Sequence, residues 1–356
     1  MRTWRMMTTS GRAVWRHACV LSLLAAAPLG AQSSVAPRPM PDSVRNYITT
    51  AVTRYRDLSV HRATTNWDSL LGSVLQVTAS AQTPSETWAA LSAAFHGVDR
   101  HSFLMPPPSS SPASDRPNTP VRPPAEPQLL GRLVQQRLGV VVVPSHGGPN
   151  RPSYVDSLHA QLQSLDSSGV CGWIVDLRRN TGGNMWPMLA GIGPLLGAED
   201  VGSFTAGGPG LLWHYRDGRA WYGGSATPTN AAGRGSAAAG PALRHAAAPI
   251  ALLLGRQTAS SGEMTAIAFF GRADLRSFGD STGGYASANA TVALRDGAQL
   301  LVTSSYPRDR LGRSYTLTLA PDELIAPSKP GEDDATVRAA STWLLRQATC
   351  RAEARR

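Results

Sequence analysis

Residues 249–263 read PIALLLGRQTASSGE, and this stretch decides the fold. The apolar run at residues 250–254 has the length of a buried strand. Residues 255–258 turn the chain, and residues 263–270 have the composition of a helix. Ser260 therefore lies where a strand ends and a helix begins.

Such a junction can support acyl-transfer chemistry. A hydroxyl there projects at the edge of the sheet, and the free N–H groups and dipole of the helix favour negative charge nearby. Acyl transfer needs that environment, because its intermediate carries an oxyanion. The same residues also suit a simpler role, in which Ser260 or Ser261 only caps the helix. This stretch alone leaves both interpretations open.

The first 31 residues have the pattern of a signal peptide. A basic start is followed by a short apolar stretch at residues 18–27 and a small-residue cleavage site at residues 29–31. The apolar stretch is too short for a membrane span, and no later segment approaches that length. We expect an exported, periplasmic or secreted protein without a membrane span. The basic residues of the start are Arg2, Arg5, Arg12 and Arg16.

The charge and the cysteine content indicate which ligands and cofactors to expect. Removing the four Arg of the signal peptide leaves 30 basic and 24 acidic residues, a net charge of +6 in place of +10. These charges are scattered, so nucleic-acid binding is not expected. No Cys/His cluster has metal-ligand spacing, and we expect neither a metal nor an organic cofactor. Cys171 and Cys350 remain after export, and the sequence leaves open whether they pair or stay separate thiols.

The mature chain divides by composition. Residues 32–105 carry apolar residues at three- and four-residue intervals, which predicts an N-terminal helical subdomain. Residues 106–128 are a Pro-rich linker, and residues 129–348 form the main domain. Strands alternate with helices there, which predicts an α/β fold with a mainly parallel sheet. A Gly/Ala-rich hairpin and loop insertion occupies residues 203–248, and residues 349–356 are a tail.

Five short motifs follow one another in a recognisable order. Their positions are DRHS at 99–102, DLRRNTGG at 176–183, TASSGE at 258–263, GDSTGG at 279–284 and APD at 320–322. Together they resemble the tail-specific (C-terminal processing) serine protease family, including its tricorn core type. The resemblance covers residues 44–325. It implies a crotonase-like β/α core with an N-terminal helical subdomain, and a substrate that is a protein or peptide.

The resemblance also implies roles for individual residues. Ser260 would be the nucleophile. The backbone N–H groups of Gly183 and Ser261 would form the oxyanion hole, and a glycine lets an N–H face the site without an intervening side chain. Many family members use a lysine as the base, but Tyr285 stands at that position. The only lysine, Lys329, lies in a Pro-flanked segment beyond the last motif.

The tricorn-type branch uses a histidine instead, and His101 matches it as the general base. The acid that supports this histidine in the branch aligns with Tyr315, which is not an acid. Asp99, Asp309 and Glu263 are candidates to orient His101, and none is favoured. Glu263 also suits a role at the start of its helix, where an acid complements the dipole.

The linker is too short for the PDZ domain that many lysine-dyad members carry. Substrate selection would then depend on the insertion at residues 203–248. The sequence thus predicts an exported serine endopeptidase of tail-specific type. An inactive protein that binds a peptide or an apolar ligand on the same scaffold is the alternative, motivated by the missing acid and lysine. An esterase or amidase is a third interpretation.

Overall fold

The computed structural model describes residues 38–107, 131–148, 152–197, 199–205, 211–223, 231–232, 240–329 and 332–353. The predicted signal peptide, most of the Pro-rich linker and parts of the 203–248 insertion lie outside these residues. The chain divides into two units, residues 1–38 and 39–356, and the description below concerns the second unit.

Three helices follow the predicted spacing at the beginning of this unit. They are α1 (Asp42–Leu58), α2 (Trp67–Val77) and α3 (Trp88–Val98), with the short 3₁₀ helix η1 (Pro84–Thr87) before α3. Tyr55 of α1 is fully buried and stacks on Phe95 of α3, with ring centroids 4.3 Å apart. Amphipathic helices of this kind bury one stripe against one another.

The helices share their core with a small sheet from a distant part of the sequence. Its strands are β1 (Phe103–Met105), β12 (Gln299–Ser305) and β11 (Ala288–Ala293), in that order. Leu300 and Val302 of β12 are buried in the same hydrophobic cluster as the helices. The N-terminal helices therefore depend on residues more than 200 positions later for a complete core.

The main sheet has the order β14-β10-β9-β4-β3-β2. Its strands are β2 (Arg132–Val134), β3 (Leu138–Val142), β4 (Gly172–Asp176), β9 (Ile250–Leu254), β10 (Leu275–Gly279) and β14 (Glu323–Leu324). All pairings are parallel except that of β2 with β3. The prediction of an α/β fold with a mainly parallel sheet is confirmed, and the crotonase-like assignment stays a prediction.

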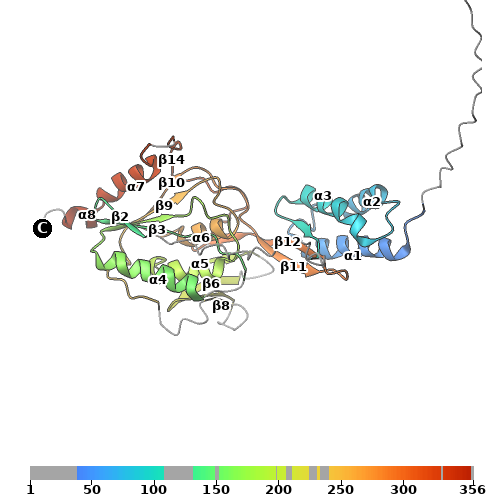
Figure 1. The fold of residues 1–356 in the computed structure, drawn as a ribbon, viewed down its shortest axis with the longest axis horizontal. Coiled ribbons are helices and arrows are strands. Elements are labelled where there is room, and N and C mark those ends of the chain that lie inside the picture. Colours follow the sequence, from blue (N-terminus) through green and yellow to red (C-terminus); the bar gives the residue numbers. More distant parts are fainter. Residues whose placement is uncertain are drawn as a thin grey trace, which may run out of the picture. The chain divides into compact units, whose positions relative to one another are not determined.

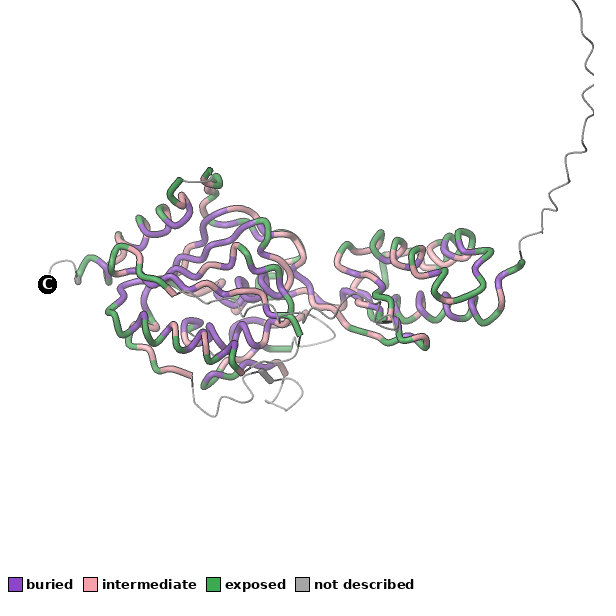
Figure 2. Tube along the Cα trace, in the orientation of Figure 1, coloured by how far each residue is buried: buried purple, intermediate pink, exposed green. Residues whose placement is uncertain are grey.

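Helices cover both faces of this sheet (Figure 1). Side chains alternate between the faces of a strand. Ile250, Leu252 and Leu254 of β9 pack in one cluster with α4 (Pro152–Ser167), α5 (Met185–Ile192) and α6 (Ser261–Phe269). Ala251 and Leu253 pack on the other face with α7 (Ala335–Leu345). The central strands are thus buried on both sides, which explains their uninterrupted apolar sequences (Figure 2).

The predicted insertion contributes a third sheet, of order β13-β5-β6-β7-β8. Its strands are β5 (Asp200–Phe204), β6 (Leu211–Arg216), β7 (Arg219–Tyr222), β8 (Ala231–Ala232) and β13 (Pro307–Asp309). The described part of the insertion up to residue 232 therefore contains antiparallel strands, as a hairpin requires, and residues 240–248 contain turns.

Two connections join the C-terminal segment to the two ends of β4. Cys171, just before β4, forms a disulfide with Cys350 of α8 (Ala348–Glu353). Arg178, just after β4, pairs with Asp176 and with Asp334, which caps α7. Of the two arrangements that the sequence allowed for the cysteines, the structure has the disulfide.

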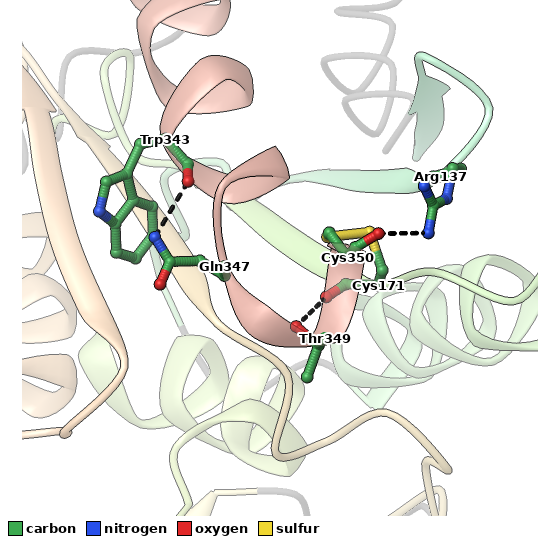
Figure 3. Close-up of a disulfide and its surroundings, with 6 residues drawn as sticks. All are labelled: Arg137, Cys171, Trp343, Gln347, Thr349 and Cys350. Carbon is green, nitrogen blue, oxygen red and sulfur yellow. Dashed lines mark hydrogen bonds between the residues drawn. A yellow bond between two sulfur atoms is a disulfide. The ribbon is translucent and has the colours of Figure 1, made fainter. Parts of the chain in front are cut away.

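Neighbouring hydrogen bonds surround this disulfide (Figure 3). The Arg137 side chain donates to the Cys350 carbonyl at 2.7 Å, and Thr349 donates to the Cys171 carbonyl at 3.2 Å. The predicted tail from residue 349 is thus helical as far as residue 353 and attached to the core. None of the helices in the described part of the chain has the length and apolar character needed to cross a bilayer.

Candidate active site

Ser260 occupies the turn between β9 and α6, as the sequence predicts. Its backbone has φ 51° and ψ −119°, a conformation that residues with a side chain rarely adopt. Strain of this kind persists only where the surroundings hold it. Thr258 fixes the turn from the other side, because its hydroxyl accepts from the Gly255 amide at 3.0 Å and donates to the Leu177 carbonyl at 2.9 Å.

The Glu263 carboxylate is what holds Ser260 in place. It is fully buried and accepts hydrogen bonds from the backbone amides of Ser260, Gly284 and Tyr285 at 2.8–2.9 Å, and from the Thr282 hydroxyl. Burial raises the pKa of Glu263, although all of these hydrogen bonds lower it. Glu263 therefore joins the nucleophile turn to the glycine-rich 279–284 turn and does not approach His101 as its orienting acid.

The second motif lies against the Ser260 turn. Asn180 is buried, and its carbonyl accepts from the Ala259 amide at 3.0 Å while its side chain accepts from the Gly182 amide at 3.0 Å. Gly182 and Gly183 have φ of 101° and 115°. A Cβ on Gly182 would lie 2.8 Å from the Ser260 Cβ, so only glycine allows this close approach.

The two residues predicted to supply the oxyanion hole lie beside each other. The Ser261 hydroxyl donates to the Gly183 carbonyl at 2.7 Å, which links the two residues. No described residue accepts a hydrogen bond from the Gly183 or the Ser261 amide. A pair of unengaged N–H groups next to a strained serine is the arrangement that can stabilise an oxyanion.

His101 lies in the turn between α3 and β1. Asp99 accepts a hydrogen bond from the His101 amide at 2.8 Å. The ring Nδ1 is 2.6 Å from the Ser287 hydroxyl, and the ring lies edge-on to Tyr285 at 5.2 Å. Burial lowers the pKa of His101, against an opposing effect of the Asp99 charge. The ring is therefore neutral at neutral pH and able to accept a proton.

No carboxylate of the described residues forms a hydrogen bond or ion pair with the His101 ring. Within His101, Asp99 accepts a hydrogen bond from the backbone amide and not from the ring. Asp309 binds Arg313 and the Tyr315 hydroxyl instead. The group that orients the ring is Ser287, which precedes β11. Sequence reasoning missed Ser287, because it belongs to no motif and a lone serine gives no signal.

Tyr285, at the position of the family's lysine, makes a different set of contacts. Its amide donates to Glu263, and its hydroxyl accepts from Arg100 at 3.2 Å. The Arg100 guanidinium also lies 4.8 Å from the centre of the Tyr285 ring, in the geometry of a cation–π contact. Tyr285 therefore supports the backbone around His101 and Ser260.

A pocket of about 570 Å³ brings these residues together. Ser260, Ser261, Gly183, His101 and Ser287 all line it. Asp99, Glu263, Tyr285 and Tyr315 do not line it. Much of the remaining described lining is apolar and includes Phe103, Met185, Trp186, Phe204, Tyr222 and Leu301.

Comparisons with known proteins agree with the motifs. The nisin-resistance protein of Lactococcus lactis subsp. lactis is 28% identical over 289 residues, which are 80% of this chain and 84% of that protein. A lipoprotein from Streptococcus agalactiae has a similar fold, with a TM-score of 0.63 and 23% identity, over 85% of this chain and 96% of its own. The photosystem II D1 C-terminal processing protease has a TM-score of 0.54 and 15% identity, over 84% and 97%.

The model of peptidase family S41 matches residues 137–325, which include the DLRRNTGG, TASSGE and APD motifs. The match spans more than half of the chain and confirms the resemblance to C-terminal processing proteases. The chain belongs to peptidase family S41.

Proposed function

We propose that this protein is an exported serine endopeptidase in which Ser260 is the nucleophile and His101 the general base. The observation that carries the proposal is the shared pocket, which both side chains line together with Gly183 and Ser261. His101 takes the hydroxyl proton as Ser260 attacks the peptide carbonyl, and the two amides bind the oxyanion. His101 then gives the proton to the leaving amine, and water hydrolyses the acyl-enzyme.

The pocket favours peptide substrates with an apolar side chain near the cleaved bond. Trp186 and Tyr222 stack with centroids 5.2 Å apart, and Phe204 lies against both. His101 is the only His, Asp, Glu, Lys or Arg among the described residues that line the pocket. A charged substrate group buried there would lack a partner, which is costly.

Two observations support export beyond the signal-peptide pattern. The Cys171–Cys350 disulfide is typical of proteins in oxidising compartments. One relative is described as a lipoprotein, and another is named for nisin resistance. We therefore place this protein in the cell envelope or outside the cell, and we include nisin among the substrates to be tested.

Hydrolysis by the mature protein tests the proposal. Purified protein is incubated with casein, with nisin and with a panel of small esters, and products are identified by mass spectrometry. We expect peptide-bond cleavage that Ser260→Ala abolishes without a change in thermal stability. Cleavage that persists in Ser260→Ala would assign the reaction to another residue. Cleavage of esters but not of peptides would favour an esterase, and peptide binding without any cleavage would favour an inactive binding protein.

A further inference from the structure

We infer that Ser287, Thr303 and Asp99 form a hydroxyl relay that fixes the proton of the neutral His101 ring on Nδ1 and leaves Nε2 as the basic atom. The inference deepens the proposed function, because the relay would take the place of a carboxylate in contact with the ring. Its structural content, the position of one proton, does not depend on whether the protein hydrolyses peptides.

The relay is a series of polar contacts from the ring to a carboxylate, in which the two outer contacts are short and the middle one is long. His101 Nδ1 lies 2.6 Å from Ser287 Oγ, and Ser287 Oγ lies 3.5 Å from Thr303 Oγ1. Thr303 Oγ1 lies 2.7 Å from Asp99 Oδ1. Thr303 is fully buried, and Ser287 is buried except for 8% of its surface. Water is thus kept from the Thr303 hydroxyl, while Ser287 lines the pocket.

The carboxylate fixes the direction of the hydrogen bond that it accepts. An ionised carboxylate only accepts, so the Thr303 hydroxyl donates to Asp99. The Thr303 oxygen can then accept the Ser287 proton, and a Ser287 hydroxyl that donates to Thr303 can only accept from the ring. In this arrangement Nδ1 carries the ring proton, and Nε2 keeps the lone pair that a general base needs.

One competing acceptor is present. Asn289 Oδ1 lies 3.3 Å from Thr303 Oγ1, but Asp99 is nearer and charged, and charge-assisted hydrogen bonds are the stronger ones. The Asn289 amide group donates to the His101 carbonyl at 3.0 Å, which places its oxygen toward Thr303. Asn289 thus helps to hold the His101 turn and leaves the direction of the relay unchanged.

The surroundings of Asp99 keep it ionised. Burial raises the pKa of Asp99, but hydrogen bonds from Thr303, the His101 amide and His61 outweigh burial and lower it. His61 Nε2 is 3.3 Å from Asp99 Oδ2 and 3.3 Å from the Tyr306 hydroxyl. Tyr55 and Tyr306 are titratable neighbours of Asp99 as well, and burial raises the pKa of both, that of Tyr55 to about 12, so both stay neutral.

The position of the proton can be measured directly. Long-range ¹⁵N–¹H NMR of the histidine rings at pH 8, assigned by comparison with His101→Asn, distinguishes a protonated from a bare Nδ1. We expect the Nδ1–H form of His101 in the wild-type protein. Thr303→Val removes the central hydroxyl at nearly constant shape, and we expect it to move the ring toward the Nε2–H form. A wild-type ring protonated on Nε2, or a Thr303→Val ring that stays Nδ1–H, would overturn the relay.

Kinetics give the second readout. Thr303→Val should lower kcat about tenfold with little change in KM, since a correctly positioned base is worth about 10²–10⁴-fold and Ser287 still contacts the ring. Thr303→Ser restores the hydroxyl and should recover most of kcat. The matched control is Thr78→Val, which removes another buried hydroxyl, bonded to the Val74 carbonyl at 2.7 Å, away from the pocket.

The two proposals fail in different ways. If Ser260→Ala has no effect on hydrolysis while the NMR result is as expected, the peptidase assignment falls and the relay stands. If Ser260→Ala abolishes hydrolysis but Thr303→Val and Thr78→Val have equal kcat and unchanged ring spectra, the relay falls and the peptidase assignment stands.

Discussion

Replacing Glu263 tests how the nucleophile turn is held. Its Oε2 accepts from the amides of Ser260 and Tyr285, and its Oε1 accepts from the Gly284 amide and the Thr282 hydroxyl. A glutamine has one oxygen and one NH₂ group, so it cannot satisfy both pairs. The hydroxyl of Thr282 can accept as well as donate, so we expect the NH₂ group to face Thr282 and Gly284.

The expected losses of unfolding free energy follow from the hydrogen-bond donors that each variant leaves without an acceptor. In Glu263→Gln the Gly284 amide is the backbone donor that loses its acceptor, which costs about 1–3 kcal/mol of unfolding free energy, and the Thr282 hydroxyl proton loses the same acceptor. The neutral side chain also avoids burying a charge, which favours the lower end of that range. In Glu263→Ala the amides of Ser260, Gly284 and Tyr285 all lose their acceptor. We expect the unfolding free energy to fall by about 3–5 kcal/mol, because water that enters the cavity accepts some of these hydrogen bonds.

Activity should fall in the same order. Glu263→Gln keeps the Ser260 amide bonded, so we expect kcat/KM to fall about tenfold. Glu263→Ala releases the strained Ser260 backbone, and a misplacement of about 1 Å costs about 10²-fold. Urea unfolding and peptide hydrolysis measure the two effects. The control is Glu86→Gln, an exposed acid that also accepts a backbone amide, which should leave hydrolysis unchanged. Equal losses of unfolding free energy and of kcat/KM in Glu263→Gln and Glu263→Ala would refute this reasoning.

Three further predictions concern other parts of the molecule. Replacing Cys171 and Cys350 together by serine should lower the unfolding free energy by about 2–5 kcal/mol in urea titrations, whereas equal stability of variant and wild type would show that the disulfide contributes nothing. A Cβ on Gly183, where φ is 115°, would lie 2.2 Å from the His146 carbonyl oxygen, so Gly183→Ala should displace the Gly183 amide. We expect fluorophosphonate labelling of Ser260 to slow about 10²–10³-fold in this variant. Unchanged labelling would argue against the Gly183 amide as an oxyanion donor. Burial lowers the pKa of His101, and the neutral ring is the active form. As the pH falls, kcat/KM should therefore stay constant down to pH 6.5 and decline only below it. A decline with falling pH that begins above pH 7 would contradict the assignment of His101 as the base.

The sequence predicts the local structure around Ser260 well. An apolar run of five residues has few alternatives to a buried strand, and the glycine-rich motifs identify turns where a side chain would clash. The motif order also identifies the family, which the family match confirms. Arg178 and Asp176, both in the DLRRNTGG motif, pair with each other where β4 ends.

Contacts between distant segments were beyond sequence reasoning. Pairing of β1 with β12 places Phe103 opposite Leu301, and neither strand has a pattern that specifies its partner. The contact of Ser287 with His101 depends on this pairing, because the same sheet contains β11. The family resemblance therefore points to a carboxylate for orienting His101, whereas the structure has a hydroxyl in contact with the ring. For the same reason the sequence does not show whether Cys171 and Cys350 pair, since 179 positions separate them.

Labelling of the folded protein with a fluorophosphonate, followed by peptide mass spectrometry, tests the central claim most directly. The account predicts a single modified residue, Ser260, with labelling that is abolished by unfolding in urea and slowed at least 10²-fold in His101→Ala. Folded wild-type protein that takes up no label, or labelling of Ser260 at an equal rate without the imidazole, would contradict it.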